Sequence, residues 1–528
     1  MFLKCDGLQL KSSTKFLNSD GGTLTGERLS EAATAFVPVA LIPQEQSLPE
    51  TKSSIAILPF TNRTGDRAND YLSDGLAEEV AQTLRGLSSL RVTAPTSAFS
   101  FKGREVNVHE VGRNLNVEVV LEGSIRCLKS KLRITVQLVN ASSGYLLWSA
   151  LYDRNIARTF DVPGEIALSV AKSLEIPLSS QDQSISKIHT ENPAAHQLYL
   201  KGRFYANRFT PDGLTAGVDF LCRAIAEDSN YALAYAGLAE AYYHLSFVHD
   251  RPAEVFEKLK AAAEKALELD ENLAEAHALL AVVATNYERM PESATGRFNR
   301  ALELSPNNVL IRQLYGSYLV TQGRLAAAIA EFSRARELDS LSPLVNVLLS
   351  HTYDFACQPN KALDYAHKAL DIDRTFWLGY WTAALAHEQM GQLKEALNQL
   401  ERASECDDSP WIGASQARLY AKLGRREVAM AALEKENQKQ GRHGAPYLVA
   451  TAYLALGEKD RAFQWLERAF EEYDETLNFM AICPLLDSCR SDPRFQDLLR
   501  RAGLDQSQAK THLVVPVMAD RLHSELGL

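Results

Sequence analysis

Residues 377–406 read WLGYWTAALAHEQMGQLKEALNQLERASEC and contain the pattern that decides the fold. Two stretches with helical spacing of apolar residues lie on either side of Gly391. Each stretch carries a small residue, Ala384 in the first and Ala396 twelve positions later, so the two helices can approach closely. Such a pair cannot bury its apolar face alone and must stack against similar pairs. The stretch therefore predicts one helix–turn–helix unit of a repeat array.

The same pattern recurs along the carboxy-terminal two-thirds of the chain. Residues equivalent to Ala384 follow one another at steps of 33 or 34, and each has a second small residue twelve positions later. The first set is Gly316, Ser350, Ala384, Ala417 and Ala450, and the second is Ala328, Ala362, Ala396, Ala429 and Ala462. Three more divergent units occupy 194–229, 230–271 and 272–306. The period predicts a mainly α solenoid of about eight helix pairs over 193–475.

A region of different character, 52–178, precedes the repeats. Residues 55–60 read IAILPF, a continuous apolar run that is typical of a strand buried on both faces. Residues 132–139 alternate apolar and polar side chains, as in a strand of a sheet with one wet face. The pattern also predicts strands at 92–94, 117–125 and 145–152, and helices at 70–87, 106–115 and 160–174. Together these elements predict a small α/β domain.

The remaining segments are polar or short. Residues 1–51 and 506–528 are expected to be poorly ordered tails, and 476–505 to form capping helices. The segment 179–192 is rich in Ser, Gln and Asp, so we expect a linker with few contacts between two independently folding domains.

Composition narrows the classes of function. The net charge of −10 and the lack of a long Lys/Arg cluster argue against direct nucleic-acid binding. The apolar stretch 35–43 is far shorter than the roughly 20 residues of a membrane helix. No export signal is evident, and the seven scattered cysteines suit reduced, mostly buried thiols. We therefore expect a cytoplasmic protein without a membrane span.

No catalytic, cofactor or metal motif is evident. The sequence contains no GxxxxGK[ST], GxGxxG, HExxH or GxSxG. Asp74, Glu78 and Glu79 are interpreted as charges that favour a helix start, with an acid/base or metal cluster as the alternative. Gly123, between two strand-like runs, predicts a bulge or tight bend. We therefore predict no enzyme activity, no cofactor and no metal.

Two resemblances follow from these motifs. The repeats resemble tetratricopeptide repeats (TPRs) over 194–475, which implies a right-handed superhelix whose first helices line a concave groove. Residues 53–178 resemble the TolB-like amino-terminal domain of bacterial signalling proteins, through ILPF at 57–60, LSDGL at 72–76, FKG at 101–103, VLEGS at 120–124 and LW at 147–148. Such proteins often carry an upstream winged-helix, cyclase or kinase module. Residues 1–50 contain none of the motifs of these modules, so we do not expect their activities.

The concave face of the repeats is the predicted functional surface. Its positions lie three residues before, and one and four residues after, each aligned small residue, and they mix aromatic, charged and hydrogen-bonding side chains. We expect the side chains of Trp381 and Arg418 to lie outside the contacts between helices. The candidate partner-binding residues are His351, Asp354, Trp381, Glu388, Arg418, Tyr447 and Thr451.

Three hypotheses for the function follow. The first is a non-catalytic scaffold or adaptor that binds a protein or peptide in the groove. The second is a regulatory component of a bacterial transcription or signalling system that acts through a separate output protein. The third is an enzyme with an unrecognised site in the α/β domain.

Overall fold

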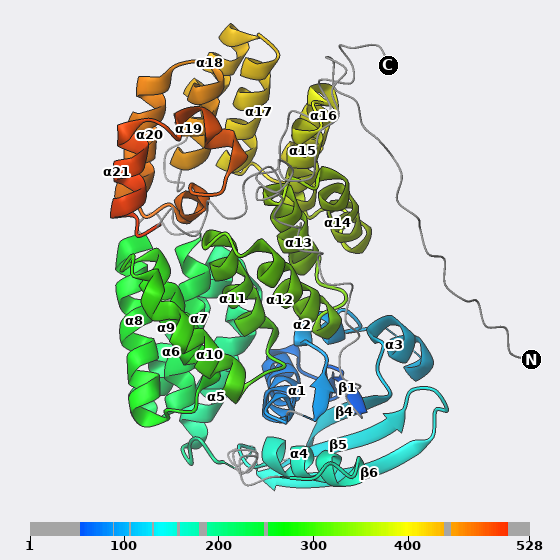
Figure 1. Ribbon diagram of the computed structural model, residues 1–528. Helices are drawn as coiled ribbons and strands as arrows, with labels where there is room; N and C mark the ends of the chain where they lie inside the picture. Colours follow the sequence, from blue (N-terminus) through cyan, green and yellow to red (C-terminus); the bar gives the residue numbers. More distant parts are fainter. Residues whose placement is uncertain are drawn as a thin grey trace, which may run out of the picture. The chain divides into compact units, whose positions relative to one another are not determined.

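A computed structural model describes residues 53–504, apart from 88, 105–106, 129–130, 156–158, 179–186, 248–251 and 438–444 (Figure 1). The predicted tails 1–51 and 506–528 and most of the predicted linker lie outside the described residues. In the part of the chain that is described, no helix combines the length and the apolar character needed to cross a membrane.

The amino-terminal α/β unit is built on a mixed sheet. Strands β3, β1 and β4 pair in parallel, and β4, β5 and β6 continue the sheet as antiparallel neighbours, in the order β3-β1-β4-β5-β6. The short β2 pairs with β4. The strands are β1 (Ser53–Ile57), β2 (Thr61–Asn62), β3 (Leu90–Val92), β4 (Val119–Leu128), β5 (Lys131–Asn140) and β6 (Leu146–Asn155).

Helices cover both faces of the parallel part of this sheet. Ile55 and Ile57 pack in one apolar cluster with α1 (Asp70–Arg85) and α4 (Val162–Ser173). Ala56, between them, packs in a second cluster with α3 (Val108–Leu115). The continuous apolar run at the start of the domain is therefore a strand buried on both faces, as its sequence predicts.

Gly123 does not mark a bulge, so that prediction is wrong. The β4–β5 ladder runs through Gly123 in regular register, opposite Val136. A side chain at this position would meet the Phe60 ring, since a Cβ built there lies 2.7 Å from Phe60 Cε1. The glycine is required because a buried aromatic ring lies directly against the strand.

Eight antiparallel helix pairs follow, which confirms the predicted TPR array. Each predicted unit corresponds to one pair: α5 (Pro193–Ala206) with α6 (Pro211–Glu227), α7 (Ala232–Ser246) with α8 (Pro252–Leu269), α9 (Ala274–Asn286) with α10 (Ala294–Leu304), α11 (Val309–Thr321) with α12 (Leu325–Leu338), α13 (Pro343–Phe355) with α14 (Pro359–Ile372), α15 (Trp377–Gln389) with α16 (Leu393–Cys406), α17 (Pro410–Lys422) with α18 (Arg426–Asn437), and α19 (Pro446–Ala455) with α20 (Lys459–Glu471).

Small residues permit the close contact within each pair. The Ser350 hydroxyl donates to the carbonyl oxygen of Ala362 on the partner helix at 2.7 Å. A Cβ added at Gly316 would lie 2.6 Å from the Phe332 ring. The turn after the first helix has a left-handed residue, which is Gly391 in the α15–α16 pair with φ of 75°. In the α13–α14 pair the same position is taken by Cys357, with φ of 53°.

The chain beyond the last pair turns back and contacts the first helix of several earlier pairs. It contains the 3₁₀ helices η5 (Glu475–Phe479) and η6 (Pro484–Cys489) and the predicted capping helix, α21 (Pro493–Arg501). The Phe479 ring lies 5.7 Å from His351 and 5.3 Å from Phe355, both on α13. The Asn478 amide donates to Asn286 of α9 at 3.2 Å. The end of the chain therefore contacts repeats from which it is far removed in sequence.

Buried ion pairs join α1 of the α/β unit to the first repeats. Arg203 on α5 donates to Glu78 at 2.7 Å and to Glu240 at 2.5 Å. His196 lies 3.0 Å from Glu79. Apolar residues of α1, α4, α5 and α7 belong to one continuous core cluster. Asp74, Glu78 and Glu79 are therefore not simply charges at a helix start, because Glu78 and Glu79 are partners in this interface.

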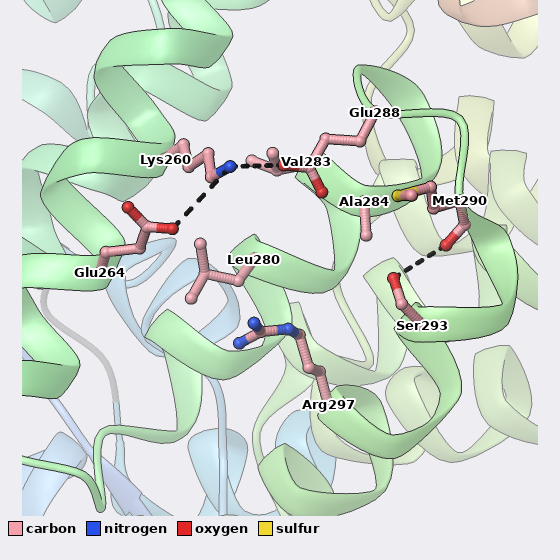
Figure 2. Close-up of a pocket in the computed structure, with 9 residues that line it drawn as sticks. All are labelled: Lys260, Glu264, Leu280, Val283, Ala284, Glu288, Met290, Ser293 and Arg297. Carbon is pink, nitrogen blue, oxygen red and sulfur yellow. Dashed lines mark hydrogen bonds and ion pairs between the residues drawn. The ribbon is translucent and has the colours of Figure 1, made fainter.

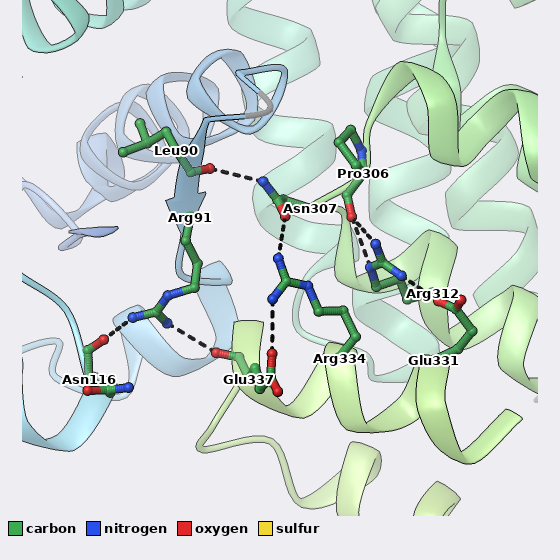
Figure 3. A network of polar contacts seen from close by, with 9 residues as sticks. All are labelled: Leu90, Arg91, Asn116, Pro306, Asn307, Arg312, Glu331, Arg334 and Glu337. Carbon is green, nitrogen blue, oxygen red and sulfur yellow. Dashed lines mark hydrogen bonds and ion pairs between the residues drawn. The ribbon is translucent and has the colours of Figure 1, made fainter. Parts of the chain in front are cut away.

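A second interface joins β3 to the fourth repeat (Figure 3). The Asn307 amide donates to the carbonyl oxygen of Leu90 at 3.0 Å, and Arg91 donates to the carbonyl oxygen of Glu337 at 3.2 Å. Arg334 donates to both Asn307 and Glu337, at 3.2 and 2.9 Å, and so supports this contact from the solenoid side (Figure 3).

The linker is expected to have few contacts, but its described residues do pair with the repeats. Within 187–192, the Lys187 ammonium lies 2.5 Å from Asp270, and the Thr190 hydroxyl donates to Asp228 at 2.6 Å. The sequence shows a polar segment, but a polar segment can still pair with charged groups on the repeats that it crosses.

Candidate binding groove

A cleft of about 450 Å³ lies at the predicted groove, between four first helices and η6. It contains four of the seven predicted residues, and His351, Trp381 and Tyr447 do not line it. Its lining comprises Asp354 from α13; Leu385, Glu388 and Gln389 from α15; Arg418 and Lys422 from α17; Thr451, Leu454 and Ala455 from α19; and Pro484, Leu485, Asp487 and Ser488 from η6.

A buried ion pair forms the floor of the cleft. The Arg418 side chain is 1% exposed and that of Glu388 is 4% exposed. Arg418 donates to both carboxylate oxygens of Glu388, at 2.9 and 3.1 Å, and to the Thr451 hydroxyl at 3.0 Å. Lys422 adds a second cation 2.8 Å from Glu388. Burial alone would raise the pKa of Glu388, but these cations lower it, so the carboxylate is ionised.

Asp354 differs from Glu388 because no cation of the described residues forms an ion pair with it. Burial raises the pKa of Asp354 to about 7; the nearby Glu388 charge adds to this rise, and Arg418 opposes it. The backbone oxygen of Asp354 accepts from the Gln389 amide at 2.9 Å. Among the described residues, no group donates to Asp354 Oδ1 or to Gln389 Oε1, although both atoms are buried.

The predicted aromatic residues lie within the packing and not on an open face. Trp381 is 3% exposed, and its indole donates to the Ser415 hydroxyl at 3.0 Å. The Trp381 ring also lies 5.2 Å from Trp411 and 5.3 Å from His351. Tyr447 is 3% exposed. The expectation that Trp381 and Arg418 lie outside the contacts between helices is therefore wrong, because stacked repeats bury large side chains at these positions.

Sequence reasoning missed several residues of the cleft. Lys422 lies one helical turn after Arg418, so the i, i+4 rule could have placed it on the same face. Gln389 follows Glu388 directly, and nothing in its register indicates a role. The η6 residues have no repeat register, and only the return of the chain over α19 brings them to the cleft.

A second cavity, of about 260 Å³, lies between α8, α9 and the turn before α10 (Figure 2). Lys260 lies at its edge, 2.5 Å from Glu288 and 3.9 Å from Glu264 (Figure 2). Leu280 contributes an apolar wall. The lysine already has two carboxylate partners, so this cavity offers a weaker basis for recognition than the groove cleft.

The thiols follow the prediction in part. Cys483 and Cys489 are buried, whereas Cys222, Cys357 and Cys406 are exposed. The prediction of buried thiols is therefore wrong for these three cysteines. Two of them lie on outward-facing positions of repeat helices, and Cys357 lies in a turn.

Comparison with known proteins finds no matching family model. The chain is 30% identical to "Putative adenylate cyclase 3" of Rhizobium meliloti (strain 1021) over 246 residues, which are 46% of this chain and 42% of that protein. It is 25% identical to "Transcriptional regulator HilA" of Salmonella typhimurium over 315 residues, which are 57% of this chain and 53% of that protein. The chain thus spans about half the length of the curated relatives that it matches.

Solved structures give more distant likenesses. The structure described as "Functional Characterization of Pseudomonas Aeruginosa pilF" is 20% identical, with a TM-score of 0.31, and the match covers 47% of this chain and 95% of that one. The structure described as "Crystal structure of YrrB: a TPR protein with an unusual peptide-binding site" is 24% identical, with a TM-score of 0.26, and the match covers 38% of this chain and 96% of that one.

Proposed function

We propose that this protein is a non-catalytic scaffold that binds a segment of a partner protein in the cleft on the inner side of the TPR array. The observation that carries the proposal is the cleft itself, because four consecutive first helices and η6 present both charged and apolar groups to it. Binding sites are generally concave, with apolar walls and a few well-placed polar groups. The occupant is an extended peptide, since the lining residues come from successive repeats.

The α/β unit serves as a second interaction or sensing module in this proposal, in keeping with its resemblance to TolB-like domains. Its edge strand, β6, carries exposed apolar side chains, among them Leu146 at 54%, Leu147 at 46% and Leu151 at 55%. An edge strand with exposed apolar residues is a surface on which another chain can pair. A non-catalytic role is supported by Glu78 and Glu79, whose carboxylates are engaged by the first repeats.

A regulatory role is the second candidate, and the curated relatives favour it. The proteins named "Putative adenylate cyclase 3" and "Transcriptional regulator HilA" both match this chain over about half of their own length. We propose that the scaffold delivers a signal to a separately encoded output protein. Such a protein should copurify with the chain and should lose its association when the cleft is altered.

The test of the scaffold function is site-specific photo-crosslinking in the native host extract. A photoreactive residue at Ser488, exposed at the cleft, should capture the partner. The same residue at Ser404, exposed on α16 and absent from the cleft, is the matched control. A partner captured from Ser488 but not from Ser404 supports the proposal. Equal capture at both positions, or capture only from Ser404, would contradict it.

A further inference from the structure

Two oxygen atoms in the groove cleft point to the chemistry of its ligand. Asp354 Oδ1 and Gln389 Oε1 are both buried and, among the described residues, neither receives a hydrogen bond. Asp354 is only 8% exposed. The Gln389 amide nitrogen is already used, because it donates to the backbone oxygen of Asp354 at 2.9 Å. Buried polar groups are nearly always paired in folded proteins, so two acceptors beside one cleft indicate a missing donor.

The charges around the cleft also leave one position uncompensated. Glu388 is paired with both cations of the lining, Arg418 and Lys422. Asp487 is paired with Arg490, at 2.6 Å. Of the three carboxylates that line the cleft, only that of Asp354 has no cation within ion-pair distance among the described residues. A cationic donor would supply both the hydrogen and the charge that this group lacks.

The rest of the lining suits an aliphatic stem. Leu385, Leu454, Ala455, Pro484 and Leu485 contribute apolar surface to the same cleft. Its volume of about 450 Å³ far exceeds the roughly 30 Å³ of one water molecule, so a side chain can enter. Lysine and arginine combine an aliphatic stem with a cationic head.

We propose that the cleft binds the ammonium or guanidinium group of a basic side chain, and that Asp354 and Gln389 accept its hydrogen bonds. The inference rests on the proposed function, because it assigns the chemistry of the partner segment in the same cleft. It predicts that the partner presents a lysine or arginine between residues that pack on the apolar walls.

Binding of a cation should depend on pH in a defined direction. Burial raises the pKa of Asp354 to about 7, and only the ionised carboxylate attracts a cation. Affinity should therefore rise as the pH increases through about 7. Among the described residues, the other titratable or charged groups near Asp354 are Cys357 in the turn after α13, Glu388 on α15, Arg418 and Lys422 on α17, and Cys483 and Asp487 on the returning segment.

The experiment uses the full chain and a blocked alanine pentapeptide with one central lysine. Calorimetric titration should give at least tenfold tighter binding of this peptide than of the same peptide with norleucine, which has a stem without the ammonium. Asp354→Asn keeps the shape but removes the charge, so it should weaken binding of the lysine peptide by about tenfold or more and abolish its pH dependence. Asp364→Asn removes an exposed carboxylate on α14 and should leave the affinity unchanged.

Each outcome decides the inference. An arginine peptide that binds with similar affinity would show that both head groups fit. n-Butylammonium binding as tightly as the peptide would support the cation site and identify a free small amine as its source. Equal binding of the lysine and norleucine peptides, or unchanged binding by Asp354→Asn, would overturn the inference. Capture of a partner from Ser488 would still support the scaffold function in that case, so the two failures can be told apart.

Discussion

At the scale of single residues, the ion pair between Arg418 and Glu388 is a buried pair of charges in the groove, and each partner depends on the other for its stability. Arg418→Met would leave Glu388 buried with Lys422 as its only cation. Breaking one side of a buried pair typically costs 3–5 kcal/mol, so we expect a loss of about 3 kcal/mol in the free energy of unfolding. Urea denaturation followed by circular dichroism measures this loss.

Two further variants test whether the loss of stability comes from the burial of the ion pair. Arg426→Met removes an exposed cation that pairs with Glu458 and should cost less than about 1 kcal/mol. The double change Arg418→Met with Glu388→Gln should recover part of the lost stability, because no buried charge is then left without its main partner. A loss in Arg418→Met no larger than in Arg426→Met would contradict the buried pair.

The protonation of Asp354 predicts a pH dependence of stability. Its pKa is about 7 in the folded protein, compared with an ordinary value of 3.8, so the folded state holds this proton more tightly. The stabilising contribution is complete below about pH 4 and is lost as the pH rises through about 7. Glu475, whose pKa burial raises to about 8, acts in the same direction. His351 acts in the opposite direction, because burial lowers its pKa to about 4.

Comparison of the wild type with Asp354→Asn isolates this contribution. We expect the variant to equal or exceed the wild type in stability at pH 8, and to lose that advantage at about pH 4. Chemical denaturation midpoints at both pH values provide the measurement. The same advantage at both pH values would mean that Asp354 does not titrate differently in the folded and unfolded states.

At the scale of elements, the segment from η5 to η6 contributes one side of the groove cleft. Phe479 on η5 anchors it against His351 and Phe355. Phe479→Ala removes a partly buried ring, so we expect a loss of about 2 kcal/mol, below the usual cost for a fully buried phenylalanine. Hydrogen exchange should become faster in η5 and η6 and stay unchanged in α12. Equal acceleration across the solenoid would mean that the segment is part of the global folding unit.

At the scale of the whole molecule, the α/β unit and the first repeats share one core, so they should unfold together. Gly75 on α1 permits this contact, since a Cβ at that position would lie 2.8 Å from Leu200 on α5. Gly75→Leu should therefore force the two helices apart. We expect one thermal transition in the wild type and two in the variant, measured by calorimetry. A single unchanged transition in Gly75→Leu would contradict tight coupling.

The sequence by itself determined the repeat architecture. The period, the small residues and the turn residues are local features that recur along the sequence. The same contact between two helices is therefore formed in each of the eight pairs. The strands of the α/β unit were equally evident from their apolar patterns, whereas β2 and α2 (Pro95–Phe99) were missed because they are too short to show a period. The registers placed seven candidate residues on the inner side of the repeats, and the structure brings four of them, Asp354, Glu388, Arg418 and Thr451, to one cleft.

Only the tertiary structure decided what surrounds those residues. The burial of Trp381 and Arg418, the return of η6 over α19 and the pairing of Glu78 with Arg203 all join segments distant in sequence. No local pattern encodes such contacts, because each depends on how the repeats stack and on where the fold places the α/β unit and η6 against them. The repeat period reflects contacts between neighbouring repeats, whereas the cleft and the shared core depend on contacts between distant parts of the described fold.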